Sequence, residues 1–259
     1  CSFCDWGKAD VSKIKRFDLD RLKAEIKWIS ENNLFYVTLA DANFGIFYDR
    51  DLEIAETAAR LARVNGYPGF MAMSWTKNSH QRLIKIAEAF SCGGFEFSVT
   101  LAMQSFNEDT LAAIGRKNIK QDSMIALKKE YHDKNLPTYI DLILGLPQET
   151  YDSFVEGLNQ AMTPRLADHW ICHLCTLLEN TEMASDEYRK RYGIVTRICA
   201  AGMARHKFNS DAETELEEIV VGTSNMPLDD WRRAYLMSNL CSAFYNLRSA
   251  FFVMNYFNN

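Results

Sequence analysis

The sequence lacks any long apolar run, and it lacks a surplus of charge of either sign. No hydrophobic stretch approaches the roughly 18–20 residues that a membrane-spanning helix requires, so no membrane segment is expected. The net charge is −5 over 259 residues, with acidic and basic residues mixed along the chain. This balance gives no electrostatic reason to expect nucleic acid or an anionic membrane as a partner.

Cysteine is also scarce, at seven residues, and the number is odd. The sequence shows no secretory signal, so a cytoplasmic setting is expected, in which paired cysteines serve metal or redox chemistry rather than structural disulfides. The first residue is Cys1 rather than methionine. We therefore expect the sequence to be part of a longer reading frame.

Hydrophobic residues make up 47% of the chain, which is enough for one large core. Short β-like runs alternate with amphipathic helical stretches, a pattern that predicts an α/β fold with a parallel sheet wrapped by helices. Periodicity alone does not choose between an open sheet and a barrel. The expected strands are 35–40, 70–75, 95–102 and 138–144, with a last strand contained in 168–178. The pattern changes near residue 180, so 181–259 is predicted to be a C-terminal helical extension packed on 1–180.

Two cysteine pairs are candidates for metal chemistry. Cys1 and Cys4 are three residues apart, a spacing that suits one metal ion or two irons of a cluster, half of a zinc site, or a redox dithiol. Cys172 and Cys175 fall in a predicted strand, where side chains three residues apart point to opposite faces. They are therefore not expected to chelate one ion together.

Polar residues and turn residues follow several predicted strands at the carboxyl end, where parallel α/β folds place their active sites. Asp41 and Asn43 suit hydrogen bonds to an ammonium or hydroxyl group, or they merely shape a turn. Gln104 has no capping role, which favours a ligand contact. Gly145 allows a close backbone approach and Pro147 enforces a turn, and for both the functional and structural interpretations stay open.

In their order along the chain, these segments resemble radical S-adenosylmethionine enzymes, and most closely the cobalamin-associated subgroup. The segment 1–7 resembles the second half of the Cys-x-x-x-Cys-x-x-Cys cluster loop. The segments 40–45, 104–111 and 144–150 resemble the ends of successive barrel strands, while 178–183 and 187–193 are similar to the stretch that follows the last strand. The resemblance implies a partial (β/α)6 TIM-like barrel over 1–180, whose first strand and first cluster cysteine would precede Cys1.

The resemblance also implies the cofactors and the chemistry. A 4Fe–4S cluster and S-adenosylmethionine are expected, with reductive cleavage that yields a radical able to abstract hydrogen from a small-molecule substrate. The electron would come from a donor such as flavodoxin or ferredoxin. Cobalamin-dependent methyl transfer, with cobalamin held by an upstream domain, and ring formation both stay open, and the substrate is not specified.

The resemblance assigns the cluster side of the site to three residues. Cys1 and Cys4 match the second and third cluster ligands, and Phe3 matches an aromatic position that lies against the adenine. Without the first cysteine of the loop, the chain by itself is expected to be catalytically impaired. A non-catalytic barrel scaffold and a zinc or redox module built on Cys1 and Cys4 are the alternatives.

Five further residues match positions that contact S-adenosylmethionine. Asp41 and Asn43 match its amino end, although the family's usual Gly-Gly-Glu is lacking there. Gln104 matches a position that faces the ribose or the carboxylate. Gly145 and Pro147 match a strand end that passes close to the adenine.

Overall fold

The computed structural model describes residues 2–4, 15–41, 43–76, 80–162, 166, 168–200, 215–249 and 256. Its centre is a set of five parallel strands in chain order. Two form one sheet, β1 (Tyr36–Thr38) and β2 (Phe70–Ala72), and three form another, β3 (Val99–Gln104), β4 (Thr138–Leu144) and β5 (His169–Leu174). A parallel bridge between Phe70 and Glu96 links the two sheets.

The predicted α/β fold is therefore confirmed, and all five expected strands are present. The described strands form open sheets and do not close into a barrel. The second strand is shorter than the predicted 70–75, because beyond Ala72 the chain makes only an isolated bridge, between Trp75 and Phe44.

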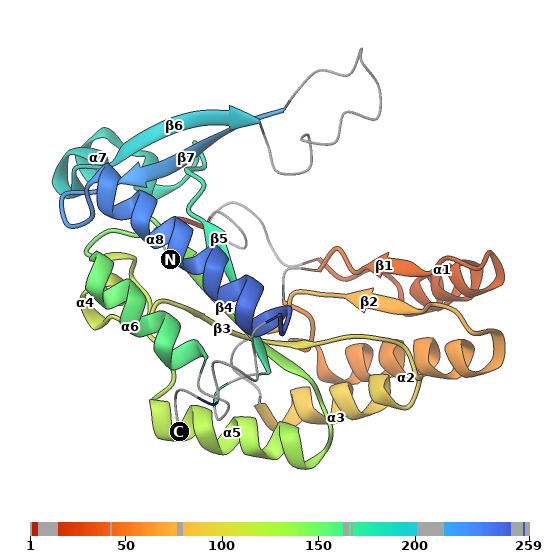
Figure 1. Cartoon of the computed structure of the whole chain (residues 1–259). Helices are drawn as coiled ribbons and strands as arrows, with labels where there is room; N and C mark the ends of the chain where they lie inside the picture. The colour runs from red at the N-terminus through yellow and green to blue at the C-terminus, as the bar shows by residue number, and fades with distance from the viewer. Residues whose placement is uncertain are drawn as a thin grey trace.

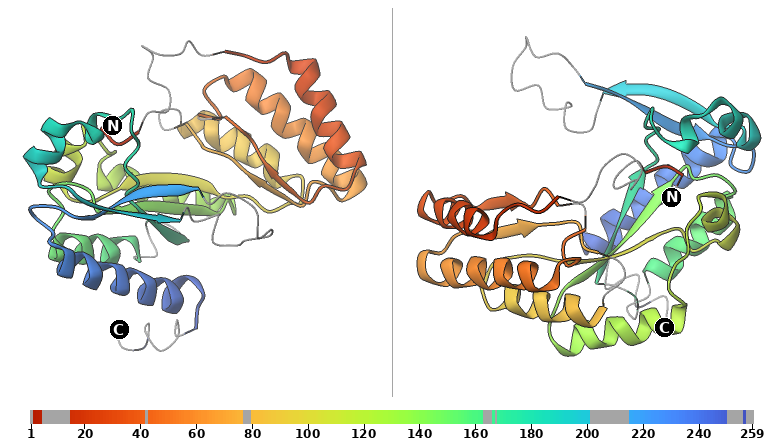
Figure 2. Two further views of the ribbon diagram at one scale, coloured as in Figure 1. Left: turned by 90° about the horizontal axis from the view of Figure 1, so that it is seen from above. Right: turned by 180° about the vertical axis from the view of Figure 1, so that it is seen from behind.

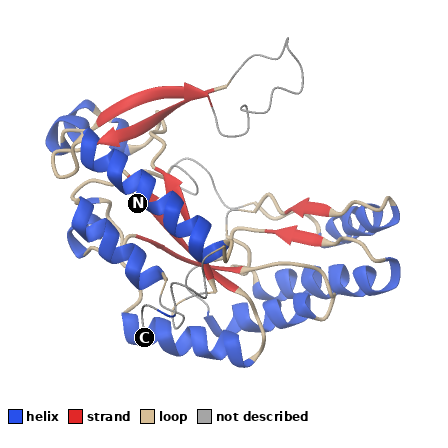
Figure 3. Ribbon diagram, in the orientation of Figure 1, coloured by secondary structure: helices blue, strands red, loops and turns tan. Residues whose placement is uncertain are grey.

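The helices that alternate with these strands are α1 (Leu19–Glu31), α2 (Tyr48–Asn65), α3 (His80–Ser91), α4 (Glu108–Ala113), α5 (Gln121–Asp133) and α6 (Tyr151–Ala161). In Figure 1 α2, α3 and α5 lie below the strands, and all helices are blue in Figure 3. Local sequence explains several of their ends. Asp18 and Asn107 cap helices by accepting from the backbone N–H three residues ahead, and Thr150 forms a capping box with Ser153.

Strand β4 shows how the two faces of the sheet differ. Ile140, Leu142 and Leu144 are fully buried in the main core beneath the helices, whereas Tyr139 and the alternate residues after it are only partly buried. Side chains alternate between faces along a strand, so one face of β4 is covered and the other is open. In the registers observed, Thr100 and Ala102 of β3 and His169, Ile171 and His173 of β5 share the open face.

The C-terminal part differs from the helical extension that the sequence predicted. It begins with a short 3-10 turn (Glu182–Ala184) and α7 (Asp186–Tyr192). An antiparallel hairpin of β6 (Val195–Ala200) and β7 (Leu216–Gly222) then precedes α8 (Leu228–Cys241) and a π-helical turn (Ser242–Asn246). The expectation of helix is thus wrong for β6 and β7.

The hairpin and α8 lie against different parts of the sheet. Backbone hydrogen bonds join β7 to the chain just after β5, from Leu177 N–H to Glu218 O (2.7 Å) and from Val220 N–H to Cys175 O (2.9 Å). Helix α8 packs against α6 and contributes Ala234 to the main core. Figure 1 and the right-hand view of Figure 2 agree that the hairpin lies on the side of the strands away from α2, α3 and α5. Among the described residues, no helix is long and apolar enough to cross a membrane.

Candidate cofactor site at the carboxyl ends of the strands

The N-terminal segment Ser2–Cys4 is fixed between α4 and α7, close to the N label in the left-hand view of Figure 2. Ser2 N–H donates to Ile114 O, and Met183 N–H donates to Ser2 O, each at 2.9 Å. The buried Ser2 hydroxyl lies 2.9 Å from the Tyr188 hydroxyl, which donates to Ala113 O at 2.8 Å. These contacts hold Phe3 and Cys4 in place. Cys1 lies outside the described residues.

Phe3 and Cys4 border a cavity of about 270 Å³ at the carboxyl ends of β4 and β5. The walls are largely apolar, and they come from β4, from β5 and from the chain that follows β5. The lining residues are Phe3, Cys4, Ile143, Leu174, Cys175, Thr176 and Leu178. The structure thus brings the described half of the predicted cluster loop to the edge of the sheet where a cofactor is expected.

The cysteines at 172 and 175 differ from Cys4 in their surroundings. Cys172 packs partly buried against the main core, whereas Cys175 belongs to a second core on the other side, where its thiol lies 3.7 Å from Met183 Sδ. The predicted divergence of these two side chains is confirmed. Burial raises the pKa of each thiol to about 12, so both stay protonated near neutral pH and are poor metal ligands. Among the described residues, no three His, Cys, Asp or Glu side chains are placed to hold a metal ion.

Gln104 ends β3 at an irregularity in the strand. Its φ is +62°, a left-handed conformation that costs a non-glycine residue about 1 kcal/mol or more. The adjoining carbonyls of Met103 and Ser105 accept from Asn118 Nδ2 at 2.9 and 3.0 Å. The side chain is buried, and its Oε1 has no hydrogen-bond partner within the described part of the chain. A strained backbone and an unpaired buried acceptor are together typical of a ligand contact.

Gly145 and Pro147 lie after β4 and are buried. Gly145 has φ +102°, and a Cβ there would lie 3.0 Å from Val220 O and 3.3 Å from Cys175 Cβ. The close approach that requires glycine is thus made by β7. A contact of Gly145 or Pro147 with adenine stays a prediction.

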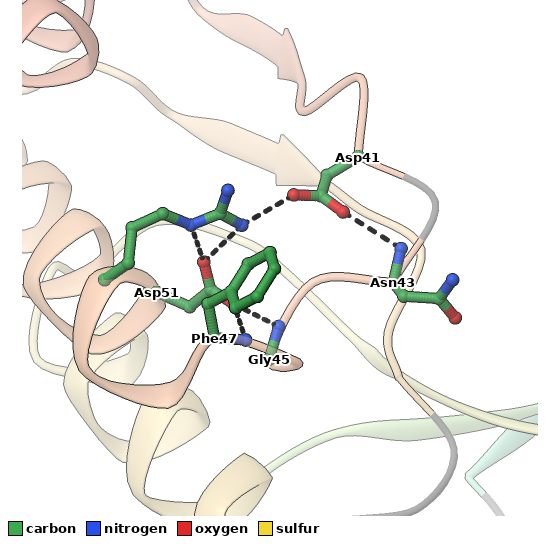
Figure 4. A network of polar contacts seen from close by, with 6 residues as sticks. Asp41, Asn43, Gly45, Phe47 and Asp51 are labelled. Carbon is green, nitrogen blue, oxygen red and sulfur yellow. Dashed lines mark hydrogen bonds and ion pairs between the residues drawn. The ribbon is translucent and has the colours of Figure 1, made fainter. Parts of the chain in front are cut away.

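Asp41 and Asn43 belong to a network that shapes the loop after β1 (Figure 4). Asp41 accepts from Asn43 N–H at 3.0 Å and from Arg50 Nη2 at 2.7 Å. The turn-forming role of Asp41 is therefore observed. Its contact, and that of the exposed Asn43, with the amino end of S-adenosylmethionine stays a prediction.

Asp51, at the start of α2, is the centre of this network, and sequence reasoning missed it. Its fully buried carboxylate accepts from Gly45 N–H (2.7 Å), Phe47 N–H (3.1 Å) and Arg50 Nε (2.6 Å). Burial raises the pKa of Asp51, while these donors oppose the rise by favouring the carboxylate. No local pattern in the sequence indicates that this carboxylate turns back onto the loop.

A second buried carboxylate joins β3 to α6. Glu149 accepts from the hydroxyls of Ser105 and Ser153, and burial raises its pKa. Through Ser105, it fixes the residue that follows Gln104. Glu149 therefore links the end of β3 to the start of α6.

Comparison with known proteins gives two curated relatives, and no protein-family model matches the chain. The chain is 34% identical over 235 residues to the cobalamin-dependent radical SAM methyltransferase TokK of Streptomyces tokunonensis, an alignment that covers 91% of this chain and 34% of that protein. It is 34% identical over 231 residues to a 2-(S-pantetheinyl)-carbapenam-3-carboxylate methyltransferase of Streptantibioticus cattleyicolor, covering 89% of this chain and 34% of that protein. The chain thus spans about a third of the length of these relatives.

A solved structure supports the fold. The radical S-adenosylmethionine methyltransferase TsrM from Kitasatospora setae, solved with tryptophan and a SAM analogue, superposes with a TM-score of 0.54 and 12% identity. The match covers 85% of this chain and 45% of that chain. The arrangement of strands and helices described above is therefore similar to that in part of this solved structure.

Proposed function

Because this chain is a homologue of cobalamin-dependent radical S-adenosylmethionine methyltransferases over 91% of its length, we propose that it forms the cofactor-binding barrel of such an enzyme. The observation that carries the proposal is the position of Cys4. Its half-buried thiol borders the 270 Å³ cavity at the carboxyl ends of β4 and β5.

The residues present suit the implied cofactors. Cys4, with Cys1 beside it in sequence, would supply cluster thiolates, and the Cys4 side chain borders the cavity. The unpaired Oε1 of Gln104 is an acceptor suited to an ammonium or hydroxyl group of S-adenosylmethionine. When bound, the cluster and S-adenosylmethionine supply reductive radical chemistry, and cobalamin supplies a methyl group.

The residues of this chain then bind and orient the cofactors and the substrate, and they shield them from water. Phe3, Ile143 and Leu174 give the cavity apolar walls, which keep water from a reactive centre. Asp51 and Arg50 hold the loop that carries Asp41 and Asn43 at the end of β1. We propose methyl transfer to a small molecule in preference to ring formation, since both relatives are methyltransferases. An electron donor such as flavodoxin or ferredoxin is part of this proposal.

The proposal is tested by replacing Cys4 in the naturally encoded protein. After anaerobic reconstitution, Cys4→Ala is expected to lose most of its bound iron and sulfide and its brown colour, and to cleave no S-adenosylmethionine. Cys172→Ala is the matched control, since Cys172 packs partly buried against the main core on the far side of the sheet, and this variant is expected to keep the cluster.

Two outcomes would contradict the proposal. Equal iron and sulfide in Cys4→Ala and the unaltered protein would show that Cys4 binds no cluster. One bound zinc, with no iron or sulfide in the unaltered protein, would indicate the zinc or redox module instead.

A further inference from the structure

The open face of the sheet carries a histidine–aspartate pair that lies outside the cofactor site described above. His173 Nε2 on β5 lies 3.1 Å from Asp141 Oδ1 on β4. The His173 side chain is 55% exposed, while that of Asp141 is 17% exposed. The carboxylate thus orients the ring from a sheltered position, and the ring remains accessible on this face.

The pair lies beside the Cys4 cavity. Ile143 is the register partner of His173 and also lines the cavity with Cys4. Asp141 is two residues before Ile143 on the same face of β4, which is about 6–7 Å along a strand. A small molecule lying on His173 would therefore reach the cavity.

The charges around the pair favour an anion. Asp141 interacts electrostatically with both His173 and Arg116, and it holds the pKa of His173 above its usual range. Burial lowers the pKa of Arg116 to about 10, which still leaves the guanidinium charged near neutral pH. When His173 is protonated, two positive groups share one carboxylate, and the excess charge is positive.

Other titratable groups on this face do not cancel that charge. Burial lowers the pKa of His169, which favours its neutral ring. Asp168, at the amino end of β5, is paired with Lys128 at 2.6 Å. Burial raises the pKa of the Tyr139 hydroxyl, which therefore stays neutral. The Tyr139 and His169 rings are stacked at the opposite end of the same face, about 13 Å from His173 along the strand.

We propose that His173, oriented by Asp141, is a substrate-binding residue that holds a carboxylate group of the small-molecule substrate. This inference rests on the proposed function and names the class of substrate. The protonated ring donates from Nε2 to Asp141 and from Nδ1 to the carboxylate, giving a charge-assisted hydrogen bond. The apolar side chains Ile143 and Ile171, which share this face near His173, then contact the rest of the molecule.

The test uses benzoate as the anionic probe and benzamide as its neutral counterpart. Histidine ring resonances of the naturally encoded protein are followed by NMR across pH, and His173 is identified by its loss in His173→Gln. Benzoate is expected to raise the titration midpoint of His173 by about 0.5 pH unit or more, and benzamide is expected to leave it unchanged. Saturation transfer from protein to benzoate should disappear in His173→Gln and persist in His169→Gln, the matched control on the same strand.

The inference is overturned if benzoate and benzamide act alike on His173, or if His169→Gln abolishes benzoate binding while His173→Gln retains it. It is also overturned if the midpoint of His173 in the free protein is not higher than in Asp141→Asn. None of these readouts requires the cluster. Iron, sulfide and S-adenosylmethionine cleavage, measured on the same preparation, test the proposed function separately.

Discussion

Replacing Asp51 is expected to destabilise the protein more than any exposed acidic substitution on the same helix. Asp51→Ala leaves the buried N–H groups of Gly45 and Phe47 without an acceptor and removes one of the two carboxylates that hold Arg50. A buried donor left unpaired costs about 1–3 kcal/mol, and breaking a buried ion pair costs about 3–5 kcal/mol. Because these losses overlap, we expect the free energy of unfolding to fall by about 3–5 kcal/mol.

The assay is urea denaturation at pH 7, followed by circular dichroism. Asp49→Ala is the matched control, because Asp49 lies in the same first turn of α2 but is exposed, and it should change the free energy of unfolding by less than about 1 kcal/mol. Asp51→Asn keeps one oxygen acceptor, so its loss of unfolding free energy should lie between those of Asp51→Ala and Asp49→Ala. A loss below about 1 kcal/mol for Asp51→Ala would refute the reasoning, since water or a rearranged loop would then satisfy these donors equally well.

Two further predictions concern the end of β3. Gln104→Leu removes an unpaired buried oxygen, so urea denaturation should show an unchanged or higher free energy of unfolding. Equilibrium dialysis should show weaker binding of S-adenosylmethionine to this variant. Unchanged binding would contradict the ligand role of Gln104. Glu149 has a folded-state pKa above its unfolded value, so the stability it contributes is full below the unfolded pKa and is lost as the pH rises through the folded pKa. Relative to Glu149→Gln, the unaltered protein should therefore lose unfolding free energy as the pH rises from 4 to 8, and an opposite slope would contradict the assignment.

The alternation of strands and helices up to residue 162 was predictable because each element carries its own periodicity and its own end signals. Asp18, Asn107 and Thr150 mark helix starts, and Gly66 closes α2 in a left-handed conformation. The hairpin β6–β7 escaped prediction for a physical reason. β6 packs little of its surface, with Ile198 72% exposed, so it lacks the alternation that marks a half-buried strand.

The sequence predicted where the candidate site lies, but it did not predict which residues contact one another there. The motifs indicated the carboxyl ends of the strands, and Phe3, Cys4 and Gln104 do lie there. Their partners come from distant segments, such as Tyr188 for Ser2, and no local pattern encodes such pairing. Asp51 was missed for the same reason, since nothing in the sequence shows that its carboxylate turns back to bind the loop after β1.

The side chains on the open face of β4 and β5 differ from those that fill the interior of a packed barrel. In a closed barrel, inward side chains fill the interior in layers and are bulky and apolar. Here the residues of β4 and β5 that share the open face include Asp141, His169 and His173, and His173 and Ile171 are exposed. If other side chains packed densely against this face, desolvating the charged pair would cost several kcal/mol. On a face that receives a polar small molecule, the same pair forms part of the binding site. The polar and exposed side chains on the open face of β4 and β5 therefore support the substrate contact proposed for His173.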